Sequence, residues 1–169
     1  MKILITSILL IFFSINIYSQ REIGLGVGGL SYGLSFHNDI NDSSSFRITG
    51  LALVYQDGDN FWDKLANLSI QYNYNLKKGE SESLYTLVAA SVLYSIEYSG
   101  SLNDSRKDNY YIAALGFGIN EIFWDTLSFT LEFHQILRLN NNVRHVDHTY
   151  TNKSILTYPS VSIYLGTIF

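Results

Sequence analysis

A two-residue alternation of apolar and polar side chains limits what this chain can fold into more than any other feature of its sequence. In the last ten residues, one parity is apolar except at Thr167, and the other parity is mostly small or polar. The apolar set is Val161, Ile163, Leu165 and Phe169, and the other set includes Ser160, Ser162 and Gly166. A repeat of two residues is that of a β-strand with one apolar face. The chain therefore ends in a predicted strand whose last residue lies on the apolar face.

The same alternation predicts strands along most of the chain. The segments that show it are residues 22–36, 46–56, 64–77, 84–98, 111–120, 127–139 and 160–169. In the first segment, the apolar positions change parity across Gly28 and Gly29, which indicates a bulge or a tight turn. Bacterial single-chain barrels have an even number of strands, so an eighth strand is needed. Either 22–36 forms two strands that turn at these glycines, or part of 142–151 is a strand. The count favours the glycine turn, or another strand before residue 45.

Charged residues are rare in these segments and keep to one face. Only 15% of the chain is charged, and the titratable residues within the predicted strands share the polar parity. They are Arg47, Glu97, Glu132, His134 and Arg138. A barrel in water would scatter Lys and Glu over its outward face, whereas Arg or Lys facing lipid at the bilayer midplane costs about 2 to 4 kcal/mol. The sequence therefore predicts an all-β fold, a closed antiparallel up-and-down transmembrane β-barrel of about eight strands.

Aromatic residues gather near the ends of the predicted strands, as expected for the two aromatic girdles of such a barrel. One group is Tyr55, Phe61 and Trp62, another is Tyr72, Tyr74, Phe123 and Trp124, and Tyr94 and Tyr98 lie beyond. The alternative at this point is a soluble lipocalin-like β-barrel that binds a small apolar ligand, because such sheets also alternate and also carry tyrosines.

The first residues have the composition of a targeting segment. Lys2 precedes an apolar run, and the small residue Ser19 follows it, which is the pattern of a secretory signal peptide. We therefore expect residues 1–19 to be a signal peptide that is cleaved near Ser19-Gln20, and residues 20–169 to form the barrel domain. An uncleaved membrane anchor is the alternative.

The closing strand, with its aromatic carboxy terminus, resembles that of bacterial outer-membrane β-barrels. Together with the export signal and a mature chain that begins near Gln20, it makes the chain resemble small outer-membrane barrel proteins of the Bacteroidota type. The resemblance implies an outer-membrane location, outer-membrane lipid and the barrel-assembly machinery as partners, and Tyr164 and Phe169 as the terminal assembly signal.

The inward residues Arg47, Glu97, Glu132, His134 and Arg138 are the candidate site. The interior of an eight-stranded barrel is just filled by side chains, and buried charges persist by pairing. We therefore expect these residues to form a structural cluster that fills the lumen. No catalytic residue, cofactor or metal ligand is predicted, and the expected role is a non-enzymatic one in envelope structure or in surface contact through loops at 57–63, 99–108 and 140–154.

Several other functions have weaker support in the sequence. Some small outer-membrane barrels are lipid A-modifying enzymes, but the deacylase pattern needs a Ser two residues after its His, and Ile136 stands there after His134. The residues His145, Asp147 and His148 have no regular spacing that would hold a metal ion. A net charge of −4 without basic clusters gives no footprint for nucleic acid.

Overall fold

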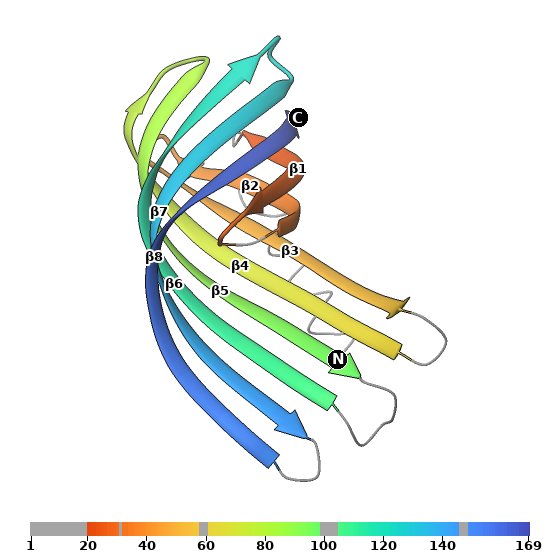
Figure 1. Cartoon of the computed structure of the whole chain (residues 1–169). Helices are drawn as coiled ribbons and strands as arrows, with labels where there is room; N and C mark the ends of the chain where they lie inside the picture. Colours follow the sequence, from red (N-terminus) through yellow and green to blue (C-terminus); the bar gives the residue numbers. More distant parts are fainter. Residues whose placement is uncertain (1–19, 31, 58–60, 99–104, 146–148) are drawn as a thin grey trace, which may run out of the picture.

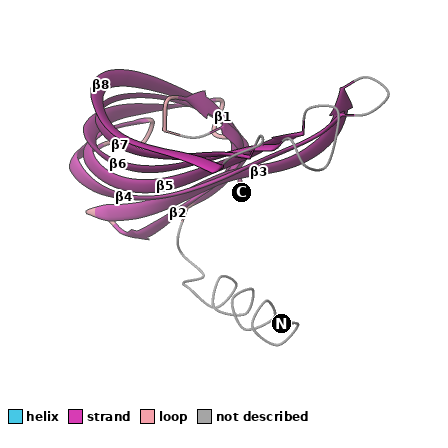
Figure 2. Ribbon diagram, turned by 60° about the horizontal axis from the view of Figure 1, so that its bottom comes forward, coloured by secondary structure: helices cyan, strands magenta, loops and turns pink. Residues whose placement is uncertain are grey.

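Eight antiparallel strands follow one another around a closed ring in chain order, and the last strand pairs with the first (Figure 1). The computed structural model describes residues 20–30, 32–57, 61–98, 105–145 and 149–169. The strands are β1 Arg21–Gly28, β2 Tyr32–Asn41, β3 Ser44–Asp57, β4 Phe61–Lys78, β5 Glu82–Tyr98, β6 Ser105–Phe123, β7 Leu127–His145 and β8 Thr149–Ile168. Figure 2 shows only strands and their connections in this part of the chain. The predicted closed up-and-down barrel of eight strands is confirmed.

No helix in the described residues is long and apolar enough to cross a membrane.

The eighth strand comes from the glycine turn. β1 ends at Gly28 and β2 begins at Tyr32, so the segment 22–36 is two short strands, as one of the two predictions had it. Glycine is required there because the wall is crowded. A Cβ on Gly28 would collide with Ser162 of β8, and a Cβ on Gly29 would collide with Ser160.

The two ends of the barrel differ. At one end, which we call the turn end, lie Gln20, which is the first described residue, the carboxy-terminal Phe169, and the short connections at 42–43, 79–81 and 124–126. At the other end, the loop end, lie the connections between β3 and β4, β5 and β6, and β7 and β8.

The predicted loop at 140–154 is wrong in extent. β7 continues to His145, and β8 begins at Thr149, with Asn140 opposite Ser154 and Asn142 opposite Asn152 in the ladder. Likewise, β4 begins at Phe61 and β6 at Ser105. Polar composition alone does not indicate a loop, because a strand with polar residues at both parities shows no alternation and is held by its backbone hydrogen bonds.

The outer face of the barrel is an apolar belt. On β4, Leu68 and Ile70 are 52% and 56% exposed, whereas Ser69 and Gln71 between them are each 2% exposed. The same alternation continues around the ring. Further exposed apolar side chains are Leu25, Leu34, Val88, Val92, Leu115, Phe117, Leu137, Val161 and Leu165. For these residues, the predicted assignment of faces agrees with the structure, whereas Ile96, predicted on the outer face of β5, is 6% exposed.

The aromatic residues near the turn end are also on the outer face. Tyr72, Tyr74, Phe123 and Trp124 are exposed, Trp124 by 84%, and Tyr94 is half-buried. The side chains of Tyr55, Phe61, Trp62 and Tyr98 lie outside the described ones.

The lumen has two parts, and only one of them is polar. The part toward the turn end holds buried polar and charged side chains. The part toward the loop end holds the apolar cluster of Leu30, Leu87, Ala89, Ile112, Ala114 and Ile136, to which Tyr85 and the partly buried Tyr158 are joined. Hydrogen-bonding groups therefore fill only one part of the lumen. Inward positions such as Leu87, Ile112 and Ile136 are apolar, and their burial adds hydrophobic stabilisation inside the ring.

The hairpin of β1 and β2 is much shorter than the rest of the wall. β1 pairs with β8 only from Glu22–Ile168 to Gly28–Ser162, and β2 pairs with β3 only as far as Leu34–Gly50. Beyond these positions, the described wall consists of six strands, with β8 and β3 at its two edges (Figure 1). Leu30, at the tip of the hairpin, is 2% exposed and packs in the apolar cluster.

Candidate functional site

The polar part of the lumen is organised around one carboxylate, that of Glu132 on β7. Its Oε1 accepts hydrogen bonds from Arg47 Nη1, Gln71 Nε2 and Tyr85 Oη, each at 2.6 Å. Its Oε2 lies 3.1 Å from His134 Nε2. Because an ionised carboxylate only accepts hydrogen bonds, His134 Nε2 is the donor in this contact. We call these five residues the Glu132 cluster.

Arg47 is held by more than the carboxylate. Its Nη2 donates to Thr130 Oγ1 at 3.1 Å, and its guanidinium lies 4.1 Å from the centre of the Tyr164 ring. A guanidinium over an aromatic face is attracted by the negative face of the ring. The charges of Arg47 and Glu132 thus compensate each other, and hydrogen-bonding side chains and the face of Tyr164 surround the pair.

Glycines in the wall make room for the two tyrosines. A Cβ on Gly118 of β6 would lie 2.5 Å from Tyr85 Cζ, and a Cβ on Gly26 of β1 would collide with the Tyr164 ring. Real side chains do not approach so closely, so these inward positions must be glycine for the tyrosines to lie flat against the wall.

The Glu132 cluster fills the cross-section of the lumen. Glu132 is 0% exposed, Arg47 1%, and Gln71 and Tyr85 2% each. The ion pair of Arg47 and Glu132 is buried and hydrogen-bonded, and breaking it by removing one partner would leave an uncompensated charge. The arrangement is that of a fixed polar plug, with no exposed nucleophile or acid among its members.

The structure brings together three of the five residues predicted for the lumen. Arg47, Glu132 and His134 are in contact, and Gln71 and Tyr85 complete their cluster. Arg138 is separate and lies nearer the loop end. The side chain of Glu97 is outside the described ones, although its backbone pairs with Arg106.

Arg138 has an aromatic environment of its own. Its guanidinium is 5.0 Å from the centre of the Tyr110 ring and 5.5 Å from that of Tyr158, and its Nη1 lies 3.5 Å from Tyr158 Oη. No described carboxylate forms an ion pair with it, and its buried Nε has no hydrogen-bond partner among the described residues.

The two residues predicted as an assembly signal face opposite ways. Tyr164 is 1% exposed inside the lumen, and Phe169 is 65% exposed on the outer face. Their part in assembly stays a prediction.

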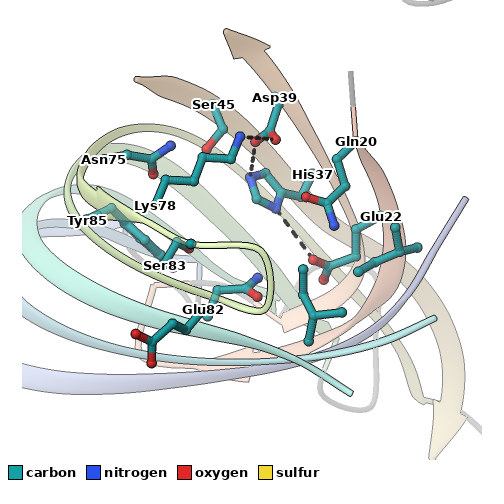
Figure 3. Close-up of a pocket in the computed structure, with 14 residues that line it drawn as sticks. Gln20, Glu22, His37, Asp39, Ser45, Asn75, Lys78, Glu82, Ser83 and Tyr85 are labelled. Carbon is teal, nitrogen blue, oxygen red and sulfur yellow. Dashed lines mark hydrogen bonds and ion pairs between the residues drawn. The ribbon is translucent and has the colours of Figure 1, made fainter. Parts of the chain in front are cut away.

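A second polar cluster lies at the turn end, and the sequence did not single it out (Figure 3). His37 Nδ1 is 3.5 Å from Glu22 Oε2, its Nε2 is 3.9 Å from Asp39 Oδ1, and Lys78 Nζ is 2.7 Å from Asp39 Oδ2. The cavity beside them has a volume of about 30 Å³, which is room for about one water molecule. The signal in the sequence was Glu22, which shares the inward parity of Gly24 and Gly26.

The described residues contain no group of three or more His, Cys, Asp or Glu side chains placed to hold a metal ion. The side chains of His145, Asp147 and His148 lie outside the described part.

Comparisons with known proteins support the fold. No family model and no curated protein sequence matches the chain. Among solved structures, the attachment invasion locus protein Ail of Yersinia pestis is similar with a TM-score of 0.51 and 13% identity, over 89% of this chain and 97% of that one. A major outer membrane protein from Thermus thermophilus is similar with a TM-score of 0.54 and 11% identity, over 90% of this chain and 98% of that one. At such identities the likeness shows that this chain has the fold of these eight-stranded barrels.

Proposed function

We propose that this chain is a small integral outer-membrane β-barrel protein with a filled lumen and a non-enzymatic role in the envelope. The loop end would face the outside of the cell and the turn end the periplasm, because short turns inside and longer connections outside are usual in such barrels. Residues 1–19 would be the signal peptide that directs export.

The observation that carries this proposal is the apolar belt. Large apolar side chains lie exposed on the outer face, such as Leu115 at 66% exposure, while the charged side chains of Glu132 and Arg47 are buried in the lumen. A protein in water would gain by the reverse arrangement, because contiguous exposed apolar surface mostly marks contact with a partner or a membrane. Hydrocarbon as the outer solvent accounts for both observations. A closed ring is also what a bilayer demands of strands.

A matched pair of substitutions on one face of β6 tests the membrane location. Leu115→Arg places a charge in the middle of the belt, and Glu121→Arg places the same charge on the same face near the turn end. We expect Leu115→Arg to cost about 2 to 4 kcal/mol and Glu121→Arg about 0 to 1 kcal/mol, because the cost falls toward the interface. The measurement is the yield of heat-modifiable folded protein in phospholipid vesicles. Equal yields for the two variants, with the wild-type chain folding without lipid or detergent, would contradict the proposal.

A filled lumen predicts that the protein does not conduct ions. The reconstituted chain in a planar bilayer should give no stepwise current, because the Glu132 cluster leaves no open cross-section. A steady stepwise current through the wild-type protein would contradict the structural role that we assign to the Glu132 cluster.

Surface contact is the physiological role that we favour. One similar barrel is named an attachment invasion locus protein, and the loop end of this chain is extended by strands up to twenty residues long. Lipid A modification has less support, since His134 is 4% exposed inside the lumen and away from the outer face, where acyl chains would lie. An assay of lipid A acylation with and without the protein separates the two roles, and we expect no difference.

A further inference from the structure

The open side of the ring is the feature that the proposed function does not use. We define it as the free edges of β8 before Val161 and of β3 after Gly50, on the loop-end side of the β1–β2 hairpin. Among the described residues, the last backbone hydrogen bond between the β1–β2 hairpin and β8 runs from Gly29 N to Val161 O at 3.4 Å. Within the described residues, no strand pairs with β8 beyond this point on the side away from β7.

The odd-numbered residues of β8 present their backbone groups to this open side. Val161 O faces β1, as Phe169 N does where it donates to Arg21 O at 3.0 Å. In an antiparallel strand, residues two apart direct their N–H and C=O groups the same way. The N–H groups of Thr157 and Ile155 therefore point to the open side, where β1 no longer provides acceptors.

The depth of the open side is that of the apolar belt. Ile155 shares the outward parity of Val161 and is 68% exposed, and the next outward residue, Lys153, is the first charge on that face. The free edge of β8 from Ile155 to Ser160 thus lies within the apolar belt, on the side nearer the loop end. Unpaired N–H groups in hydrocarbon cost several kcal/mol each, so a polar acceptor is needed there.

Another strand is a poor candidate for this acceptor. The only proline of the chain, Pro159, is the first odd residue of β8 beyond the β1 ladder. Its position would otherwise direct an N–H to the open side, and proline has none. Prolines and lysines on an edge are devices that prevent pairing with further strands, and Lys153 lies on the same edge.

The charge next to the open side is positive. Arg138 lies opposite Leu156 in the ladder, and its guanidinium contacts both the Tyr110 ring of β6, at 5.0 Å, and the Tyr158 ring of β8, at 5.5 Å. Leu156, on the inner face beside it, is 41% exposed, so this part of the inner face is accessible. The guanidinium has no ion pair among the described residues, and the free N–H groups belong to β8, the strand that pairs with that of Arg138. Guanidinium groups and backbone N–H groups both bind carboxylate or phosphate oxygens.

We propose that the open side binds the anionic headgroup of an outer-leaflet lipid, with Arg138 as the cation and the free N–H groups of β8 as further donors. The acyl chains would stay outside against the belt, where Ile155 is exposed. This inference rests on the proposed membrane location, because only a barrel in a bilayer presents the open side to lipid.

The test compares two lipids in one preparation. The full mature chain is placed in phosphatidylcholine nanodiscs with a trace of spin-labelled phosphatidic acid or of phosphatidylcholine labelled at the same chain position. We expect a larger immobilised fraction for phosphatidic acid. Arg138→Gln should lower the relative affinity for it about tenfold, as the loss of a charge-assisted hydrogen bond implies. Arg138→Lys should keep much of the selectivity.

Lys153→Gln is the matched control, since it removes an outward cation of the same edge and should leave the selectivity in place. Selectivity that disappears with Lys153 and survives in Arg138→Gln would overturn the proposal, and so would equal immobilisation of the two lipids. Displacement of the labelled phosphatidic acid by millimolar inorganic phosphate would show a site for free anions and would overturn the lipid assignment. If the chain does not enter nanodiscs at all, the proposed membrane location itself fails, which is a different outcome from entry without selectivity.

Discussion

The two parts of the lumen hold the barrel together by opposite means. Toward the turn end, the Glu132 cluster joins strands through charge and directed hydrogen bonds, and Glu132 alone accepts from three donors on one oxygen. Toward the loop end, Leu87, Ile112 and Ile136 join strands by packing alone. Directed bonds fix which atoms meet, while packing tolerates exchange among side chains of similar volume. The polar part therefore specifies the register of the ring, and the apolar part adds stability with little specificity.

Removing the central carboxylate is the largest expected effect. Glu132→Ala leaves Arg47 buried and without its counter-charge, which should destabilise the barrel by about 3 to 5 kcal/mol. The measurement is urea unfolding of the protein refolded in phospholipid vesicles. Glu121→Ala, which removes an exposed carboxylate on β6, is the control and should have little effect. A small loss of unfolding free energy in Glu132→Ala would mean that water reaches Arg47 and that the Glu132 cluster does not close the lumen.

Truncation in the apolar part should cost somewhat less. Ile136→Ala, at a position with 0% exposure, should destabilise the barrel by about 3 kcal/mol through lost burial and the cavity that remains. Ile136→Leu should cost under about 1.5 kcal/mol, since it keeps the volume. The same urea titration checks both variants. Equal losses of stability in Ile136→Ala and Ile136→Leu would show that the apolar part of the lumen depends on the exact shape of its side chains. The two parts of the lumen would then not differ in specificity.

Filling a glycine slot should have the smallest effect of the three. Gly118→Ala pushes a methyl group against the Tyr85 ring and should cost about 1 to 3 kcal/mol, the usual range for overpacking. Tyr85→Leu in the same chain removes the ring and should make the added methyl nearly neutral. If the losses of stability from Gly118→Ala and Tyr85→Leu simply add in the double variant, Gly118 is not needed to make room for the Tyr85 ring.

Much of the fold was predictable from the sequence because alternation reports which side of a strand faces which solvent. It placed Leu131 outside and Glu132 inside, and it indicated a turn at Gly28 and Gly29 as one of the possible origins of the eighth strand. It did not predict the ends of β7 and β8, since Asn140 and Asn142 lie in a ladder whose faces are both polar.

The contents of the lumen were harder to predict. Parity places Ile136 inside, but a single sequence does not say that inward apolar residues from several strands meet at one level. The partner of Glu132 was also hidden, because Arg47 is 85 positions away and the two meet only through the register of the whole ring. The contact between His37 and Glu22 at the turn end depends on register in the same way.

The short β1–β2 hairpin also sets the order in which the ring can come together or part. Each ladder that involves β1 or β2 has seven register pairs, whereas the ladder between β7 and β8 has nineteen. A cylinder of strands opens by losing one ladder, and the ladder with the fewest hydrogen bonds needs the least free energy to separate. We therefore expect the amino-terminal hairpin to be the first part of the ring to separate, while the longer ladders of the other six strands hold.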